Sequence, residues 1–116
     1  MKKFSLAILF LFVTVLSFAQ TKIDVDSVKQ YVGQQVTVCT NVSGVKALEK
    51  MTFINLKNPY PQSPLTIVIF TKDIANFSTA PATLYEGKNI CVTGTIIEYK
   101  GKLEIVVTKP EEITIQ

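Results

Sequence analysis

The sequence predicts a small all-β domain in which five short strands close into a barrel. Five segments rich in Val, Ile and Thr either alternate in polarity or are apolar throughout, and Gly or Pro residues separate them. A longer insert, residues 73–88, lies between the third and fourth segments and has room for only one or two helical turns. Five strands with an insert at this point are the pattern of the OB-fold, a five-stranded Greek-key barrel.

Residues 1–19 have the composition of a secretory signal peptide. Lys2 and Lys3 form a basic start, an uncharged apolar stretch follows, and Ser17 and Ala19 supply small residues at the two positions that a signal peptidase recognises. The stretch is short for a transmembrane anchor and has no basic flank on its C-terminal side. We therefore expect cleavage after Ala19 and export to the periplasm or the medium, with no membrane anchor on the mature chain.

Residues 20–116 are expected to form a single OB-fold domain, because their number suffices for one small core but not for two. The full chain has 12 Lys and Arg residues against 9 Asp and Glu residues. Without Lys2 and Lys3 the balance is 10 to 9, a net charge of +1. Nucleic-acid binding by a domain this close to neutral requires a local basic patch.

The segment IDVDSVKQYVG predicts a short helix before the first strand. Asp24 is placed to cap its free amides, and Val25, Val28 and Val32 are expected on one face. Gly33 can adopt the left-handed conformation that ends a helix. The valine face predicts that this helix packs on the barrel.

The first strand is expected at residues 34–48, with Val36, Val38 and Val42 on one face and a bend or bulge at Gly44. A stiff Pro-rich loop separates the second strand from the third, which is apolar on both faces, and Lys100 and Gly101 form a tight turn between the last two strands. The second to fifth strands are expected at residues 50–56, 65–72, 90–99 and 102–108. Pro110 is expected to end the sheet.

Four stretches, YVGQQVTVCTNV, MTFINLKNPYPQSPLTIVIF, LYEGKNICVTGTI and EYKGKLEIVVTKPEEI, resemble a family of small bacterial OB-fold domains. The family pattern is a strand ending in Phe-x-Asn, a Pro-Tyr-Pro loop, a Val-Ile-aromatic strand and a Gly-Lys-x-x-x-Val-x-Gly strand. The resemblance covers residues 23–113. It implies a nucleic-acid-binding domain, often in exported proteins and sometimes beside a nuclease domain.

The sequence contains no arrangement of residues that is typical of an enzyme. It has no histidine, no cluster of Cys and acidic residues at metal-ligand spacing, and no Gly-rich phosphate loop. Adjacent acids such as Glu111 and Glu112 are more typical of solvated surface charge than of catalysis. We therefore expect a monomeric binding module without catalytic residues, metal or cofactor.

The expected ligand face is the outer surface of the second and third strands, because OB-folds bind ligands there. Strand alternation turns the aliphatic residues inward and leaves Phe53, Asn55 and Phe70 outside, as aromatic platforms surrounded by lysines. The surrounding residues are Lys46, Lys50, Lys57, Tyr99, Lys100 and Lys102. Single-stranded nucleic acid is the first expectation. An oligosaccharide, a protein partner or no ligand at all are the alternatives. A separate alternative for the residues themselves is that Phe53 and Phe70 are core residues, covered by the N-terminal helix or the Pro-rich loop, and that the lysines are ordinary surface charge.

The two cysteines predict a disulfide. Cys39 shares its face of the first strand with Thr37, and Cys91 shares its face of the fourth strand with Thr93, so both cysteines point away from the core. The two strands are antiparallel neighbours in an OB barrel, which brings outward side chains opposite one another. In an exported chain we expect a Cys39–Cys91 bond, and two free thiols are the alternative.

Overall fold

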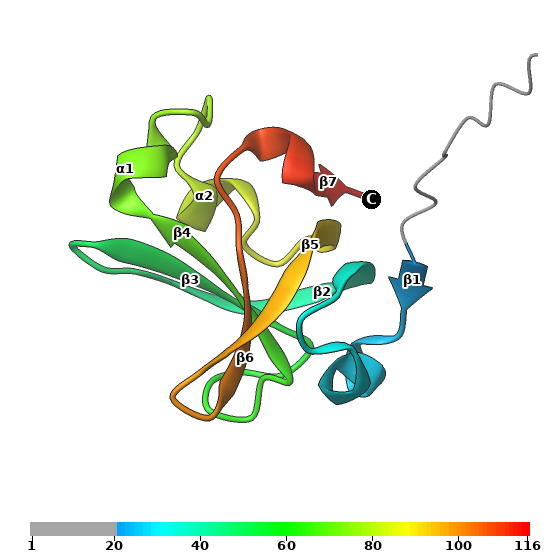
Figure 1. The fold of residues 1–116 in the computed structure, drawn as a ribbon. Helices are drawn as coiled ribbons and strands as arrows, with labels where there is room; N and C mark the ends of the chain where they lie inside the picture. Colours follow the sequence, from blue (N-terminus) through cyan, green and yellow to red (C-terminus); the bar gives the residue numbers. More distant parts are fainter. Residues whose placement is uncertain (1–20) are drawn as a thin grey trace, which may run out of the picture.

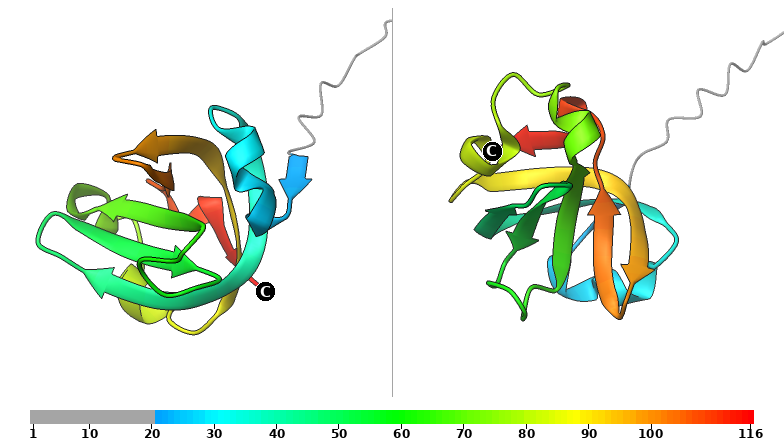
Figure 2. Two further views of the ribbon diagram at one scale, coloured as in Figure 1. Left: turned by 90° about the horizontal axis from the view of Figure 1, so that it is seen from below. Right: turned by 90° about the vertical axis from the view of Figure 1, so that its left-hand side faces the viewer.

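The computed structural model describes residues 21–116, so the predicted signal peptide lies outside the described residues. Five strands pair in a closed ring, and all neighbours are antiparallel except β4 and β6, which are parallel. In ring order the strands are β2 (Gln35–Ala47), β3 (Met51–Leu56), β4 (Leu65–Phe70), β6 (Lys102–Val106) and β5 (Asn89–Tyr99) (Figures 1 and 2). This strand order and direction is the OB-fold, as predicted.

The long strand β2 takes part in two different pairings. Residues 35–41 pair with β5, and residues 42–47 pair with β3. The register shifts between Val42 and Gly44, so the bend predicted at Gly44 is confirmed. A bulge of this kind bends a strand and lets a curved sheet close on itself.

Two short strands extend the ring beyond the five that were predicted. β1 (Thr21–Ile23) runs parallel to β2, and β7 (Ile113–Ile115) runs antiparallel to β5. The prediction that Pro110 ends the sheet is therefore wrong. Pro110 instead begins the 3-10 turn η2 (Pro110–Glu112), where its missing N–H costs no hydrogen bond, and the chain then returns to the sheet.

The predicted N-terminal helix is the 3-10 helix η1 (Val25–Tyr31), capped by the side chain of Asp24. Val25 and Val28 are buried, but Val32 is 43% exposed, so its predicted place on the same face is wrong. A 3-10 helix has three residues per turn, which aligns Tyr31, not Val32, with the buried valines. Tyr31 accordingly packs against the core.

The interior of the barrel is aliphatic, and the predicted alternation in β3 and β4 is confirmed. The aliphatic side chains that are fully buried in these two strands are Ile54, Leu56, Leu65, Ile67 and Ile69, and Thr52 on the same face of β3 is 1% exposed. The third strand ends at Phe70, so the predicted strand end at residue 72 is wrong, and the insert begins two residues earlier than predicted. The insert forms α1 (Thr71–Ile74) and α2 (Pro81–Leu84), which lie together at one end of the barrel (Figure 1). Among residues 21–116, no helix has the length and apolar character that a membrane crossing requires.

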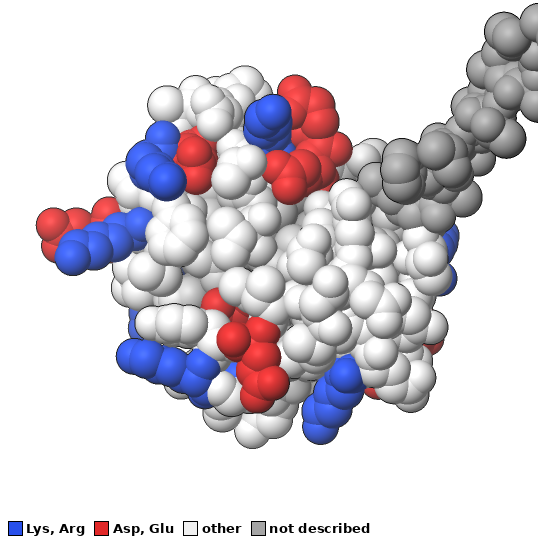
Figure 3. All heavy atoms as spheres, in the orientation of Figure 1, with Lys and Arg blue, Asp and Glu red and all other residues white. Residues whose placement is uncertain are grey.

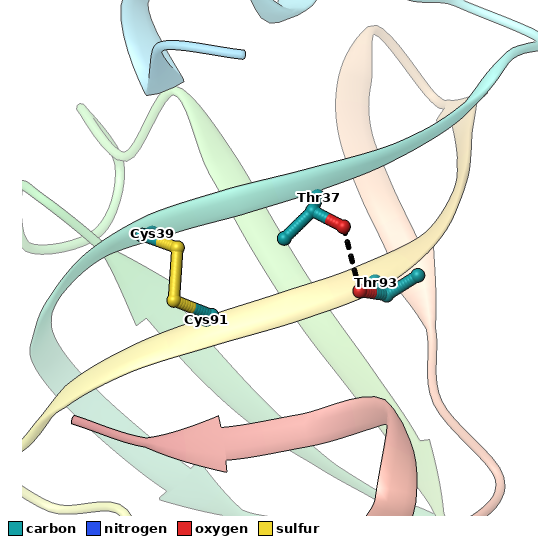
Figure 4. The surroundings of a disulfide bond; sticks show 4 residues. All are labelled: Thr37, Cys39, Cys91 and Thr93. Atoms are coloured by element: carbon teal, nitrogen blue, oxygen red, sulfur yellow. Dashed lines mark hydrogen bonds between the residues drawn. A yellow bond between two sulfur atoms is a disulfide. The ribbon is translucent and has the colours of Figure 1, made fainter. Parts of the chain in front are cut away.

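The Cys39–Cys91 disulfide is confirmed. The two residues are opposite one another in the β2–β5 ladder, with their Cα atoms 4.0 Å apart. The neighbouring pair on the same outer face, Thr37 and Thr93, joins its hydroxyl groups by a 2.8 Å hydrogen bond (Figure 4). Both contacts link β2 to β5, the two strands whose pairing closes the ring.

Candidate ligand-binding groove

A groove of about 570 Å³ crosses the outer face of β3, β4 and β6. The loop after β3 and the β5–β6 turn lie at the end of the barrel opposite the short helices (Figure 1). Figure 2 shows β4 and β6 side by side beneath this face. The residues that line the groove are Lys46, Leu48, Met51, Phe53, Asn55, Tyr60, Thr66, Val68, Phe70, Ile97, Tyr99, Lys100, Lys102, Glu104 and Val106.

Most of the groove floor is apolar, because strand register aligns hydrophobic residues across the sheet. Phe53 lies opposite Val68, and Val68 lies opposite Val106 on the next strand. Met51 and Phe70 form the adjacent pair. Phe53 and Phe70 are partly exposed and lie outside the barrel interior, so their rings present a surface to the groove.

The rest of the floor is a polar row, which we define as Asn55, Thr66 and Glu104. These residues stand opposite one another on β3, β4 and β6, and they are 7%, 8% and 9% exposed. The Thr66 hydroxyl donates a 3.0 Å hydrogen bond to Oδ1 of Asn55. Three nearly buried polar side chains thus cross the groove beside its apolar part.

Among the described residues that line the groove, Glu104 has the only acidic side chain. Burial raises the pKa of its carboxyl group above the usual range, and the nearby Lys102 ammonium lowers it by a smaller amount. Among the described residues, no group donates a hydrogen bond to this carboxylate. Its oxygens are therefore available to a ligand.

Aromatic and basic residues form the rim of the groove. The Lys102 ammonium lies 3.6 Å from the centre of the Tyr60 ring, which is a cation–π contact between the β5–β6 hairpin and the Pro-rich loop. Lys100 lies 5.4 Å from the centre of the Tyr99 ring. Tyr60 and Tyr99 are 68% and 56% exposed, so both rings are open to a ligand.

The structure brings most of the predicted site residues together, and two lie elsewhere. Those that line the groove are Lys46, Phe53, Asn55, Phe70, Tyr99, Lys100 and Lys102. Lys57 forms an ion pair with Asp26 of η1, outside the groove. Lys50 lies beside Phe70 in an adjoining shallow depression.

Sequence reasoning missed eight groove residues: Leu48, Met51, Tyr60, Thr66, Val68, Ile97, Glu104 and Val106. For most of them strand alternation carried a signal. Glu104 is two positions from the predicted Lys102 in one strand, so alternation places both on the same face. Thr66 and Val68 share the face of Phe70 for the same reason. Tyr60 belongs to an irregular loop, where alternation makes no prediction.

Charged residues are interspersed on one face of the molecule. On the face drawn in Figure 3, basic and acidic side chains occur in small groups on a largely uncharged surface. Within residues 21–116, no group of His, Cys, Asp and Glu side chains is arranged to hold a metal ion. The residues that line the groove offer stacking, hydrogen bonding and a few local charges.

Comparisons with solved structures define the class of this domain. No protein-family model and no curated protein matches the sequence. An asparaginyl-tRNA synthetase from Pyrococcus horikoshii matches with a TM-score of 0.57 and 14% identity, over 81% of this chain and 22% of the synthetase. An OBody bound to hen egg-white lysozyme matches with a TM-score of 0.56 and 17% identity, over 75% of this chain and 83% of the OBody.

A chain of the Stn1–Ten1 complex of S. pombe has a TM-score of 0.55 and 13% identity, over 71% of this chain and 57% of that one. This chain thus spans less than two thirds of both the synthetase and the yeast protein. At these identities the likeness establishes the fold alone. The chain is an OB-fold domain with an open groove on the face where OB-folds bind their ligands.

Proposed function

We propose that this chain is a non-catalytic binding module whose groove takes single-stranded nucleic acid. The observation that carries the proposal is the set of partly exposed aromatic rings inside a rim of lysines. Aromatic platforms stack on bases, and lysines beside them attract the phosphate backbone. Stacking of this kind contributes on the order of 1–3 kcal/mol per base.

The groove supplies both components on one face. Phe53 and Phe70 offer ring surface on the floor, and Tyr60 and Tyr99 offer it at the rim. Lys46, Lys100 and Lys102 provide the positive charge. The synthetase among the structural neighbours acts on tRNA, as its name states, which agrees with a nucleic-acid ligand for this fold.

We further propose that the mature domain functions outside the cytoplasm as a monomer. The disulfide supports this location, because such bonds persist in oxidising compartments. The signal-peptide composition of residues 1–19 agrees with it. N-terminal sequencing of protein recovered from the exported fraction is expected to begin at Gln20.

An oligosaccharide is the second candidate, and the polar row favours it. Asn55 and Glu104 could hydrogen-bond sugar hydroxyl groups while an aromatic ring stacks on the apolar face of the sugar. A protein partner is the third candidate, since the neighbouring OBody is bound to lysozyme. These ligands differ from nucleic acid in their response to salt.

Fluorescence anisotropy with labelled DNA octamers at two salt concentrations tests the proposal. Phosphate contacts release counterions, so affinity is expected to fall steeply as the salt concentration rises. Replacing Lys102 by Gln is expected to weaken binding to all sequences and to lower the salt slope by about one. Lys29→Gln is the matched control, because Lys29 is an exposed lysine of η1 outside the groove.

Two results would contradict the proposal. One is an absence of binding to any octamer. The other is binding that is equally strong at both salt concentrations and in Lys102→Gln. Glycan binding by the same protein with little salt dependence would then favour the oligosaccharide.

A further inference from the structure

The polar row presents hydrogen-bonding groups that the protein itself does not use. Thr66 donates to Oδ1 of Asn55, and no described residue accepts a hydrogen bond from the Asn55 amide group. The Glu104 carboxylate likewise receives no hydrogen bond from the described residues. Both side chains are more than nine-tenths buried, and both line the groove.

These groups face the groove and keep contact with solvent there, since neither is among the buried polar atoms that lack a partner. A ligand that enters the groove displaces this water. It must then supply hydrogen bonds to both groups, because leaving them unpaired on binding would cost free energy. The row therefore favours ligands whose edge carries the matching donors and acceptor.

The row has a definite order of donors and acceptors. Asn55 offers amide N–H donors on β3, and Glu104 offers two acceptor oxygens on β6. Adjacent strands are about 4.8 Å apart, so the two backbones are roughly 10 Å apart with the short Thr66 side chain between them. A flat ligand edge that fits between the two head groups needs an acceptor facing Asn55 and donors facing Glu104.

Among the nucleobases, guanine has this edge. Its Watson–Crick side carries the O6 acceptor followed by two adjacent donors, N1–H and the N2 amino group. Cytosine and adenine each place a ring-nitrogen acceptor beside a single amino group, and thymine and uracil place one N–H between two acceptors. A carboxylate can therefore accept two hydrogen bonds side by side only from guanine.

We propose that the polar row makes the groove selective for guanine in single-stranded nucleic acid, with Glu104 accepting from N1–H and N2–H and Asn55 donating to O6. This inference rests on the proposed function. The apolar part of the floor completes the site, because Phe53 lies two residues along β3 from Asn55, at the next position on the same face. A base whose ring stacks on Phe53 can direct its edge towards the polar row. Bases in single strands are commonly recognised by this combination of stacking and edge contacts.

The test compares oligonucleotides that differ at one base. The probes are dT octamers with a single dG, dC, dA or inosine at a central position, measured by fluorescence anisotropy at about pH 8. We expect the dG probe to bind about 10-fold more tightly than all-dT, within the range of a bidentate contact between a side chain and a base. Inosine lacks the N2 amino group, so it is expected to lose most of this advantage.

The variant Glu104→Gln provides the protein side of the test. It keeps the size of the side chain but replaces one acceptor by a donor and removes a negative charge. The dG preference is therefore expected to disappear, while the affinity for all-dT is expected to rise modestly. Glu98→Gln is the control, because Glu98 is an exposed acid of β5 that does not line the groove. The inosine comparison uses the native protein and does not depend on the folding of any variant.

The possible outcomes separate this inference from the proposed function. Salt-dependent binding of all probes with equal affinity would overturn guanine selectivity and leave nucleic-acid binding standing. If the inosine probe binds as tightly as the dG probe, or if Glu104→Gln still prefers the dG probe, the proposed role of the polar row is overturned. If no probe binds, the proposed function fails, and guanine selectivity fails with it.

Discussion

At the scale of single residues, we expect Glu104 to lower the stability of the folded domain while providing a hydrogen-bond acceptor for a ligand. Its carboxylate lies on the groove floor, 9% exposed and without a hydrogen-bond donor from the described residues. The charged form pays a desolvation cost that no internal contact offsets, apart from the attraction of Lys102. Natural sites often keep such unfavourable groups where a ligand needs them.

Glu104→Gln is expected to gain stability relative to the native protein at neutral pH. Burial raises the pKa of Glu104 in the folded state above its unfolded value. The contribution of Glu104 to stability is therefore fully present below its unfolded pKa and is lost as pH rises through its folded pKa. Urea unfolding at about pH 4 and pH 8 measures the effect, and the benefit of the Gln variant is expected to be larger at pH 8. Equal changes at both pH values would show that the carboxylate is not desolvated.

Replacing Phe53 by Ala separates a groove platform from a core residue. The ring is partly exposed and outside the interior cluster, so we expect a stability loss well below the ~3–5 kcal/mol of a truncated buried aromatic. Affinity for oligonucleotides is expected to fall by roughly the 1–3 kcal/mol of one stacked base. Thermal unfolding and anisotropy measure the two effects. Ile115→Ala, an exposed apolar residue of β7, is the control and is expected to leave affinity unchanged.

At the scale of elements, β5 resembles β2 in taking part in more than one pairing. Its residues 89–95 pair with β2, and residues 96–99 pair with β6. Gly94 lies next to the change of partner, where the chain passes close to the core side chain of Ile105. A Cβ atom at this position would lie 2.5 Å from Cγ2 of Ile105, too close for any real contact.

Gly94→Ala is therefore expected to destabilise the domain by about 1–3 kcal/mol, the usual cost of overpacking a core. The matched control is Gly44→Ala in β2, because a Cβ there would have no atom within 4 Å. Denaturant unfolding of both variants measures the difference. If the two variants have the same stability, Ile105 moves aside at little cost and β5 does not need glycine.

At the scale of the whole molecule, the disulfide joins residues 52 positions apart at the seam that closes the ring. Cross-linking a loop of this length restricts the unfolded chain. The chain-entropy estimate is about 4 kcal/mol, a large share of the stability of a small domain. The bond therefore acts mainly through the unfolded state, whatever contacts it makes in the folded one.

Replacing both cysteines by Ser is expected to lower the free energy of unfolding by up to about 4 kcal/mol, because the unfolded chain regains its freedom. Urea unfolding of the double variant and of the reduced native protein measures the loss. The nearby Thr37–Thr93 pair provides a control: Thr93→Val removes one hydroxyl group but keeps the cross-link, and its cost is expected to be much smaller. An unchanged midpoint in the double variant would contradict the estimate.

Strand alternation explains which parts of this structure could be predicted. The ring strands, the inward face of β3 and β4 and the pairing of Cys39 with Cys91 all follow from period-two patterns in a known barrel order. The short strands β1 and β7 carry too few residues for a pattern, and tertiary pairing defines them. The position of Lys57 depended on a distant partner, Asp26, which no local pattern shows.

The double pairing of β2 has a consequence for how the chain folds. Its residues 35–41 need β5, which begins only at Asn89, so a chain made from its N-terminus leaves that edge of β2 unpaired until most of the sequence exists. Contacts between distant residues slow folding, because the entropy of loop closure is lost before the contacts form. An unpaired strand edge is also a template for pairing with other chains. We expect closure of the β2–β5 seam to be a late step, with the growing chain most exposed to aggregation before residues 89–99 arrive.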